Sequence, residues 1–229
     1  MNAALARLLL SVAYPLLAHA ASTLRDPRLA ALALLDIVLI LLVVPLLRRR
    51  GWAWALAFIA AVALWAVQRS DALPVMLLLP PVLFPWLVAW FFARTLRAGE
   101  VPLITRIVAG VEGQAPEALS PALVAYSRGL TRVWACVLAG IGAANLLLGL
   151  VAVPDGLLVQ LGYVPPVTVS QVAWSWFANL LDYGLVALLL VIEYLVRARK
   201  FPQRPYATLP GFVRRVGTLG PTFWRDVLR

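Results

Sequence analysis

Long apolar runs separated by short polar breaks dominate the chain. Six of these runs are close to the roughly 20 residues that an α-helix needs to cross the hydrocarbon core of a bilayer. They cover about residues 3–21, 29–47, 51–68, 72–92, 133–153 and 171–197. The pattern predicts an all-α, polytopic transmembrane helical bundle of about six spans within residues 1–197, followed by a basic cytosolic tail at 198–229.

The last run, QVAWSWFANLLDYGLVALLLVIEYLVR, carries polar residues along one side. At 100° per residue, an arc of roughly 80° holds Gln171, Ser175, Asn179, Asp182, Glu193 and Arg197, here called the polar stripe. A carboxylate at the bilayer centre costs at least about 2.5 kcal/mol, so the polar stripe should face other helices rather than lipid.

Two contacts of the polar stripe follow from spacing and depth. Asp182 should hydrogen-bond across to Asn145, which lies at a similar depth in the fifth run. Glu193 and Arg197 are four residues apart in the favourable order for a helix ion pair. For Asp182, a proton or cation site is the alternative interpretation.

The first two runs contain isolated polar residues. His19 and Asp36 lie toward the same side of adjacent antiparallel spans and are expected to pair, either structurally or as a proton relay. Ala18-His19-Ala20 also imitates a signal-peptidase site. A leader carries its positive charge ahead of its apolar run, whereas Arg7 lies inside this one, so we favour a retained span.

Proline marks the fourth run and the connection that follows it. The fourth run contains Pro74, Pro80, Pro81 and Pro85, which predict a bent or broken helix because each removes a backbone donor. In the cytosolic connection 93–132, Pro102 can start a short helix that would lie on the membrane surface. One face of that helix carries Leu103, Ile104, Ile107, Val108 and Val111, and the other carries Thr105, Arg106 and Glu112.

A longer helix should begin at the end of this connection. Ser120 and Pro121 read as an N-cap followed by proline at the first helical position. The helix is expected to run through Tyr126 and Arg132 into the fifth run and to end near Val153.

Composition and charge place the chain in a membrane. Hydrophobic residues make up 63% of the sequence and charged residues 13%, against about 25% charged in soluble domains. The net charge of +10 would suggest nucleic acid for a soluble protein, but here it is explained by topology, and no nucleic-acid partner is expected. With the amino terminus inside, all of the 20 lysines and arginines except Arg25, Arg28 and Arg69 fall on the cytoplasmic side, when Arg7 and Arg197 are counted with the cytoplasmic ends of the runs that contain them. Both termini should therefore be cytoplasmic.

No catalytic motif stands out. The chain lacks a P-loop, a GxSxG elbow and an HExxH pair, and it has one histidine and one cysteine, so we expect no metal or cofactor and lean against an enzyme. Cys136, within an apolar run, is expected to be a small buried residue.

Basic and aromatic residues at the cytosolic side form a candidate docking surface. They are Arg94, Arg97, Arg106, Tyr126, Arg128, Arg132 and Arg197. Such a surface suits an anionic head group, a phosphopantetheine thioester or an acidic carrier protein, since arginine binds phosphate and carboxylate bidentately. Positive-inside bias alone is the competing explanation.

Five short motifs stand out in the second half of the chain and just before it, namely Phe91-Phe92-Ala93-Arg94-Thr95-Leu96-Arg97, Pro102-Leu103-Ile104-Thr105-Arg106, Tyr126-Ser127-Arg128 with Thr131, Glu193-Tyr194-Leu195-Val196-Arg197 and Phe201-Pro202. Together they resemble an uncharacterised family of bacterial inner-membrane proteins. The resemblance covers roughly Phe84 to Pro202. Members of that family are encoded in gene clusters for aryl polyene and xanthomonadin-like pigments, beside acyl carrier proteins and acyl-chain enzymes. The resemblance implies a part in building or placing a fatty-acid-like pigment.

Three hypotheses about function follow. The first is an inner-membrane accessory component that docks carrier-bound acyl intermediates, or their enzymes, on the basic cytosolic face. The second is a small transporter or flippase for an amphiphilic product, which would use the fourth helix and the polar stripe. The third is a membrane acyl-thioester enzyme with Glu193 or His19 as the base. Membrane lipids are expected partners in each case.

Overall fold

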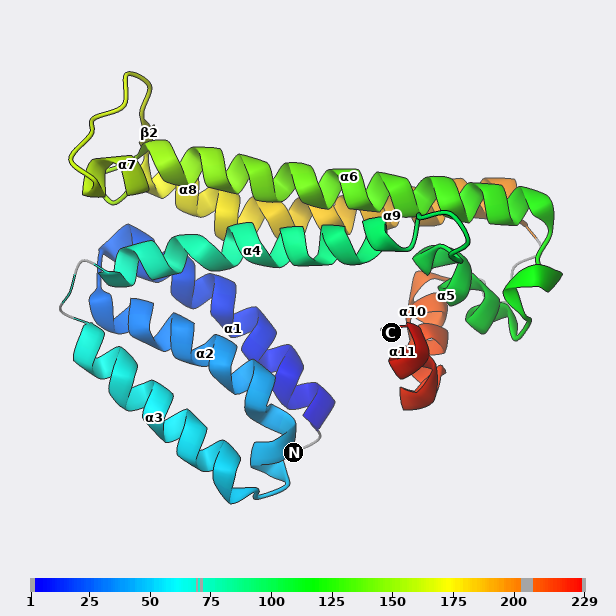
Figure 1. The fold of residues 1–229 in the computed structure, drawn as a ribbon, viewed down its shortest axis with the longest axis horizontal. Coiled ribbons are helices and arrows are strands. Elements are labelled where there is room, and N and C mark those ends of the chain that lie inside the picture. The colour runs from blue at the N-terminus through cyan, green and yellow to red at the C-terminus, as the bar shows by residue number, and fades with distance from the viewer. Residues whose placement is uncertain (1–2, 69, 71, 203–207, 228–229) are drawn as a thin grey trace. The chain divides into compact units, whose positions relative to one another are not determined.

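The computed structural model describes residues 3–68, 70, 72–202 and 208–227 (Figure 1). Arg69, which entered the charge count above, lies outside the described residues. All long elements among the described residues are α-helices, so the predicted all-α class is confirmed. The chain forms two compact units. Unit 1 comprises Met1–Leu83 and Ala143–Gly184, and unit 2 comprises Phe84–Gly142 and Leu185–Arg229.

Unit 1 begins with three consecutive antiparallel helices, α1 (Ala3–Leu24), α2 (Pro27–Leu47) and α3 (Gly51–Val67), with α2 packed against both others (Figure 1). Asp26 starts α2 by accepting a hydrogen bond from the Arg28 N–H at 2.8 Å. Small buried residues line the contact between α1 and α2, namely Ala18, Ala21, Ala30 and Ala33. Their size allows the two backbones to approach closely, as in helix pairs within membranes.

Apart from residues 72–83, the rest of unit 1 comes from the second half of the chain, Ala143–Gly184. Helix α6 (Pro121–Val151) leads to the strand β1 (Ala152–Val153), which pairs in parallel with β2 (Val169–Ser170). Between the strands lies α7 (Leu157–Gln160). Helix α8 (Gln171–Trp176), a π-helical turn, η2 (Phe177–Leu181), and α9 (Asp182–Lys200) then follow without interruption. Trp174 of α8 is 1% exposed and packs with Leu78 and Ala178 in a small core.

Helix α4 (Ala72–Arg94) is continuous, and it starts in unit 1 and ends in unit 2. The prolines at positions 80, 81 and 85 all lie within it. Of the predicted bend or break, the break was therefore wrong. The proline ring fixes φ near −65°, which is compatible with an α-helix. The prolines therefore do not end α4, although each lacks a backbone N–H donor.

Unit 2 is built around α5 (Leu103–Glu112), followed by the 3₁₀ turn η1 (Pro116–Ala118). As predicted, Pro102 precedes α5, and Ser120 caps α6 by accepting a bond from the Leu123 N–H at 3.3 Å. The apolar face of α5 contributes Ile104, Val108 and Ala109 to a core shared with α4 and α6. Two short helices of the tail, α10 (Leu209–Thr218) and α11 (Gly220–Val227), also pack on α5.

One residue of α5 does not lie on the face that the sequence pattern predicts. Thr105 was expected on the polar outer face, but it is 1% exposed. Its hydroxyl lies 2.7 Å from that of Ser127, which is itself fully buried, and this bond satisfies both groups inside the unit. Threonine can therefore extend the buried face of this helix.

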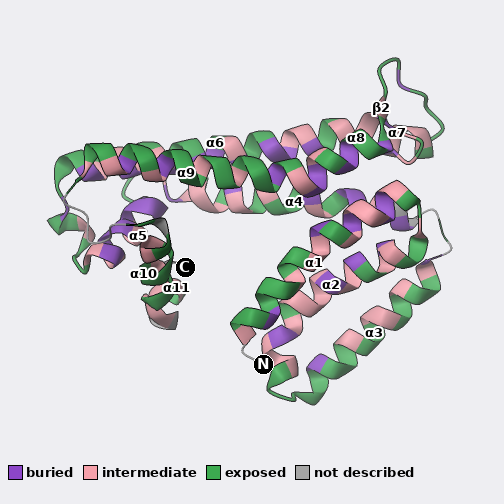
Figure 2. Ribbon diagram, turned by 180° about the vertical axis from the view of Figure 1, so that it is seen from behind, coloured by how far each residue is buried: buried purple, intermediate pink, exposed green. Residues whose placement is uncertain are grey.

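Within the described residues, five helices are long and apolar enough to cross a membrane. They are α1, α2, α4, α6 and the continuous helix Gln171–Lys200. Helix α3 is equally apolar but has 17 residues and buries only Ala53 (Figure 2). Large apolar side chains are also exposed, among them Phe58 at 70% and Leu41 at 71%, as expected for surfaces that face lipid. Cys136, which we expected to be buried, is exposed on α6.

Candidate functional site

The polar stripe is buried along its whole length. Relative exposure ranges from 0% at Ser175 to 9% at Glu193. The other members are Gln171, Asn179, Asp182 and Arg197, at 2–7%. The neighbouring apolar residues Leu181 and Leu188 are more than half exposed, at 54% and 55%. The prediction that the stripe faces protein is therefore confirmed.

The predicted link between Asp182 and Asn145 is present. The Nδ2 group of Asn145 on α6 donates a short hydrogen bond to Oδ2 of Asp182 on α9. Asn145 is 1% exposed and Asp182 7%. The second carboxylate oxygen of Asp182, Oδ1, is buried and has no hydrogen-bond partner among the described residues. This bond ties α6 to α9 within unit 1.

The π-helical turn η2 lies in the middle of the polar stripe. The Asp182 N–H donates to the carbonyl of Phe177, five residues back, instead of four. The Asn179 side-chain amide donates to both the carbonyl and the hydroxyl of Ser175, each at 3.1 Å. Such turns are rare in proteins, and those that do occur are often found at functional sites. No pattern in the sequence predicts this one, since hydrophobic periodicity does not report a single wide turn.

His19 contacts the polar stripe rather than Asp36. Its Nδ1 lies 2.9 Å from the Ser175 hydroxyl, and its ring packs edge-on against Trp176 at 4.9 Å between centroids. The predicted pairing of His19 with Asp36 was therefore wrong. Asp36 is 5% exposed, and its Oδ2 has no hydrogen-bond partner within the described part of the chain. A chain of polar contacts from His19 through Ser175 to Asn179 results.

In unit 2, the other end of the polar stripe forms the predicted ion pair. Glu193 Oε1 and Arg197 Nη2 are 2.5 Å apart, and their side chains are 9% and 6% exposed. The Arg197 guanidinium also lies over the rings of Tyr126 at 6.0 Å and Phe212 at 5.7 Å. Lys200 Nζ is 5.6 Å from the centre of the same Tyr126 ring. Tyr126, Arg197 and Lys200 therefore form one cluster, here called the basic–aromatic cluster.

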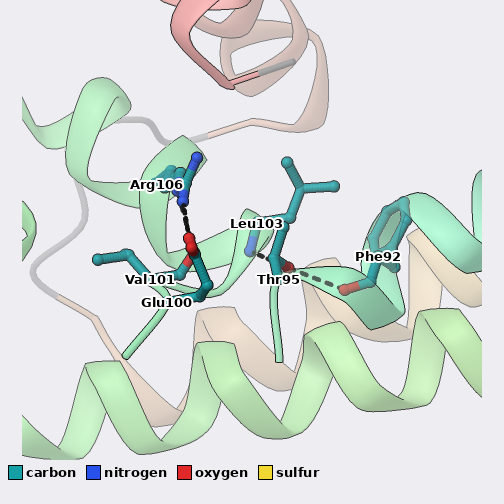
Figure 3. Close-up of polar contacts among 6 residues, drawn as sticks. All are labelled: Phe92, Thr95, Glu100, Val101, Leu103 and Arg106. Atoms are coloured by element: carbon teal, nitrogen blue, oxygen red, sulfur yellow. Dashed lines mark hydrogen bonds and ion pairs between the residues drawn. The ribbon is translucent and has the colours of Figure 1, made fainter. Parts of the chain in front are cut away.

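The other arginines of the candidate docking surface have separate local contacts. Arg106 forms an ion pair with Glu100 at 2.8 Å and donates to the Val101 carbonyl at 3.0 Å (Figure 3). Arg94 lies over the ring of Phe91 at 4.2 Å. Arg97 and Arg132 are exposed, and Arg128 is half-buried. Of the seven predicted docking residues, the contacts described here join only Tyr126 and Arg197.

Buried hydroxyls fix α5 close to this region. Thr95, just after α4, accepts a bond from the Leu103 N–H at 2.9 Å and donates to the Phe92 carbonyl at 2.8 Å (Figure 3). Thr131 of α6 accepts from the Ile104 N–H at 3.3 Å. These bonds satisfy amides at the start of α5, which have no partner inside the helix.

A groove of about 340 Å³ runs between α6 and α9 in unit 2. From α6 it is lined by Ala125, Tyr126, Gly129, Leu130 and Val133, and from α9 by Leu189, Ile192, Glu193 and Val196. The residues at positions 125, 129 and 133 share one helix face, and the first two are small. The groove contains one end of the buried ion pair and a ring of the basic–aromatic cluster. Sequence reasoning missed it, although the small residues at 125 and 129 were a usable signal.

Comparisons with known protein families, with curated proteins and with solved structures found no match to this chain.

Proposed function

We propose that this protein is an inner-membrane accessory component that holds the acyl chain of carrier-bound biosynthetic intermediates. The acyl chain would lie in the groove between α6 and α9, and the anionic phosphopantetheine that carries it would meet the basic–aromatic cluster. The observation that supports this most strongly is the continuity of the two features, since Tyr126 belongs to both. The sequence resemblance to the pigment-cluster family favours an aryl polyene or a similar lipid pigment as the product class.

The groove suits a hydrocarbon chain, and the cluster suits the group attached to it. All lining residues except Glu193 and Tyr126 are aliphatic or glycine, and each buried methylene contributes about 0.8 kcal/mol relative to water. Bilayer lipids offer the same methylenes, so the groove alone would not distinguish an intermediate from a phospholipid. Selectivity must come from the polar end, where Lys200 is exposed and Arg197 is fixed by its ion pair.

We also propose a topology of six spans, with α3 as a short sixth span and both termini in the cytoplasm. This places the basic–aromatic cluster and α5 at the cytosolic surface. A test uses a Cys136→Ala background with a single added cysteine at Val164→Cys or Ala98→Cys, both of which are exposed positions. In intact cells, an impermeant maleimide should label Val164→Cys and spare Ala98→Cys. The opposite pattern would reverse the orientation.

The groove itself is tested by filling it. A Cβ at Gly129 would meet no atom within 4 Å, so Gly129→Leu can place a side chain in the groove without a backbone clash. The assay measures retention of an acyl-loaded carrier protein by the protein in lipid nanodiscs. We expect Gly129→Leu to reduce that retention to the level of the unloaded carrier.

Two controls separate this effect from general damage. Gly140 is also on α6, is exposed and has open space around its Cβ position, but it does not line the groove. Gly140→Leu should therefore leave retention unchanged. Lys200→Glu should weaken binding several-fold, and Arg199→Glu, at an exposed neighbouring position, should have a smaller effect. Equal retention of loaded and unloaded carrier by the wild type would refute the proposal.

A second candidate, a small transporter for an amphiphilic product, is favoured by the polar contacts of unit 1. A buried carboxylate with one unbonded oxygen lies beside a π-helical turn, and His19 reaches the same stripe. Such features mark proton or substrate paths in membrane helices. For this candidate, Asp182→Asn should stop product export while synthesis continues. Export at the wild-type rate would eliminate it.

A further inference from the structure

A second cavity lies within unit 1 and shares no residue with the groove between α6 and α9. Its volume is about 270 Å³, and its walls come from the α1–α2 connection, the α3–α4 connection, the start of α4 and the segments on both sides of α7. The polar groups that line it include Arg25, Asp26, Gln68, Asp155 and Gln171. The nearby apolar wall is formed by Leu73 and Leu77. At about 30 Å³ per water molecule, the cavity has room for roughly nine non-hydrogen atoms.

Gln171, one of the residues that line the cavity, has an unsatisfied side-chain oxygen. Its side chain is the first member of the polar stripe, and the residue is 7% exposed. Its Oε1 atom is buried and has no hydrogen-bond partner among the residues that the structure describes. A buried amide oxygen without a donor costs about 1–3 kcal/mol, so this position favours a bound group that carries N–H or O–H.

The described residues that line the cavity carry charges of both signs. In the described part of the chain, neither Arg25 nor Asp155 takes part in an ion pair or a side-chain hydrogen bond. Asp26 differs, because its Oδ1 already caps α2. The cavity therefore offers a guanidinium for an anion, and a carboxylate and an amide oxygen for a cation.

We propose that this cavity binds a small zwitterion that carries a phosphate and a primary ammonium group, the chemistry of phosphoethanolamine. The guanidinium of Arg25 pairs with the phosphate, since arginine binds phosphate bidentately. The ammonium group donates to the carboxylate of Asp155 and to Oε1 of Gln171. The size of the cavity fits one such head group. This inference does not depend on the proposed function, because the cavity shares no residue with the groove.

The test compares three probes on the full-length protein in detergent, namely phosphoethanolamine, inorganic phosphate and ethanolamine. Binding is read from the rise in the unfolding temperature with probe concentration. Phosphoethanolamine should bind at least tenfold more tightly than either fragment. Equal affinities for all three probes, or no saturable rise with any of them, would overturn the proposal.

Charge variants assign each half of the ligand to one side chain. Asp155→Asn should lower the affinity for phosphoethanolamine and for ethanolamine about tenfold and leave the affinity for phosphate unchanged. Arg25→Gln should lower the affinity for phosphoethanolamine and for phosphate and leave the affinity for ethanolamine unchanged. Arg28→Gln is the control, because Arg28 is exposed and does not line the cavity. If both variants fold normally and both lose binding of all three probes, the assignment is contradicted. The wild-type order of affinities remains a test if a variant does not fold.

The zwitterion has two sources, a free metabolite or a phospholipid head group. Nanodiscs of phosphatidylethanolamine and of phosphatidylglycerol distinguish them when the bound lipid is counted by native mass spectrometry. A lipid source predicts one retained phosphatidylethanolamine that is lost in Asp155→Asn. If the ligand is a free metabolite, neither lipid should be retained preferentially. In both kinds of nanodisc, added phosphoethanolamine should then displace bound inorganic phosphate from the protein.

Discussion

The ion pair between Glu193 and Arg197 gives the sharpest prediction about stability. Both side chains are almost completely buried, at 9% and 6% exposure, and they belong to one helix four residues apart. Arg197→Met removes one charge and keeps much of the side-chain volume. It leaves Glu193 buried without its counter-charge. The double variant Glu193→Leu/Arg197→Met removes both charges together.

The expected magnitudes follow from this burial. Breaking a buried ion pair by removing one partner costs about 3–5 kcal/mol, whereas replacing both partners by apolar residues is often neutral or stabilising. The ring contacts of Arg197 with Tyr126 and Phe212 contribute roughly 0.5–1 kcal/mol each, so they are the smaller effect. Arg197→Met should therefore cost about 3–5 kcal/mol, and the double variant should recover most of that loss.

The assay is a double-mutant cycle on purified protein unfolded in mixed micelles and followed by helical circular dichroism. Lys200→Met is the control, because Lys200 lies over the same Tyr126 ring but is exposed. It should change the free energy of unfolding by less than about 1 kcal/mol. The reasoning would be refuted if Arg197→Met and Glu193→Leu each cost less than about 1 kcal/mol and if these two costs simply add in the double variant.

Three further predictions concern buried contacts. Asp182→Leu, which removes the acceptor of an interhelical bond, should lower the free energy of unfolding by about 1–2 kcal/mol, and Asp182→Asn by less than about 0.5 kcal/mol, as measured by the same unfolding assay. Gly142→Ala should lower the thermal midpoint, because a Cβ there would come within 2.6 Å of Trp86 Nε1, whereas Gly140→Ala should not; equal midpoints would contradict the packing. Thr105→Val keeps the side-chain shape but loses a buried hydroxyl bond, so it should cost about 1 kcal/mol, and a neutral result would exclude that bond.

The features predictable from sequence are those that a strong energetic rule enforces. A carboxylate in hydrocarbon is costly, so the inward direction of Asp182 and its bond to Asn145 both follow from the amino-acid pattern alone. The ion pair of Glu193 and Arg197 follows from helix spacing in the same way. Strong capping signals at Ser120 and Pro102 likewise predict two helix starts correctly.

The features that sequence could not supply depend on which helices are neighbours. Charge and depth match His19 to Asp36, but α1 packs against α8 as well as α2, and Ser175 is the hydrogen-bond partner that the fold brings to His19. The helical pattern places Thr105 on the polar face, although a hydroxyl is readily buried once a facing Ser127 satisfies it. The groove between α6 and α9 is equally hidden, because nearly all of its lining residues are aliphatic or glycine and such residues also suit a surface that faces lipid.

The central claim is that the polar stripe of α8, η2 and α9 faces protein while the opposite side faces acyl chains. The most direct measurement uses the unmodified protein in liposomes that contain a phospholipid with a diazirine on its acyl chain. After photolysis, mass spectrometry locates the labelled residues. We predict labels at exposed apolar positions such as Leu181 and Leu188, and none at Ser175, Asn179 or Asp182. Labels at those three stripe residues equal to those at the leucines would contradict the claim.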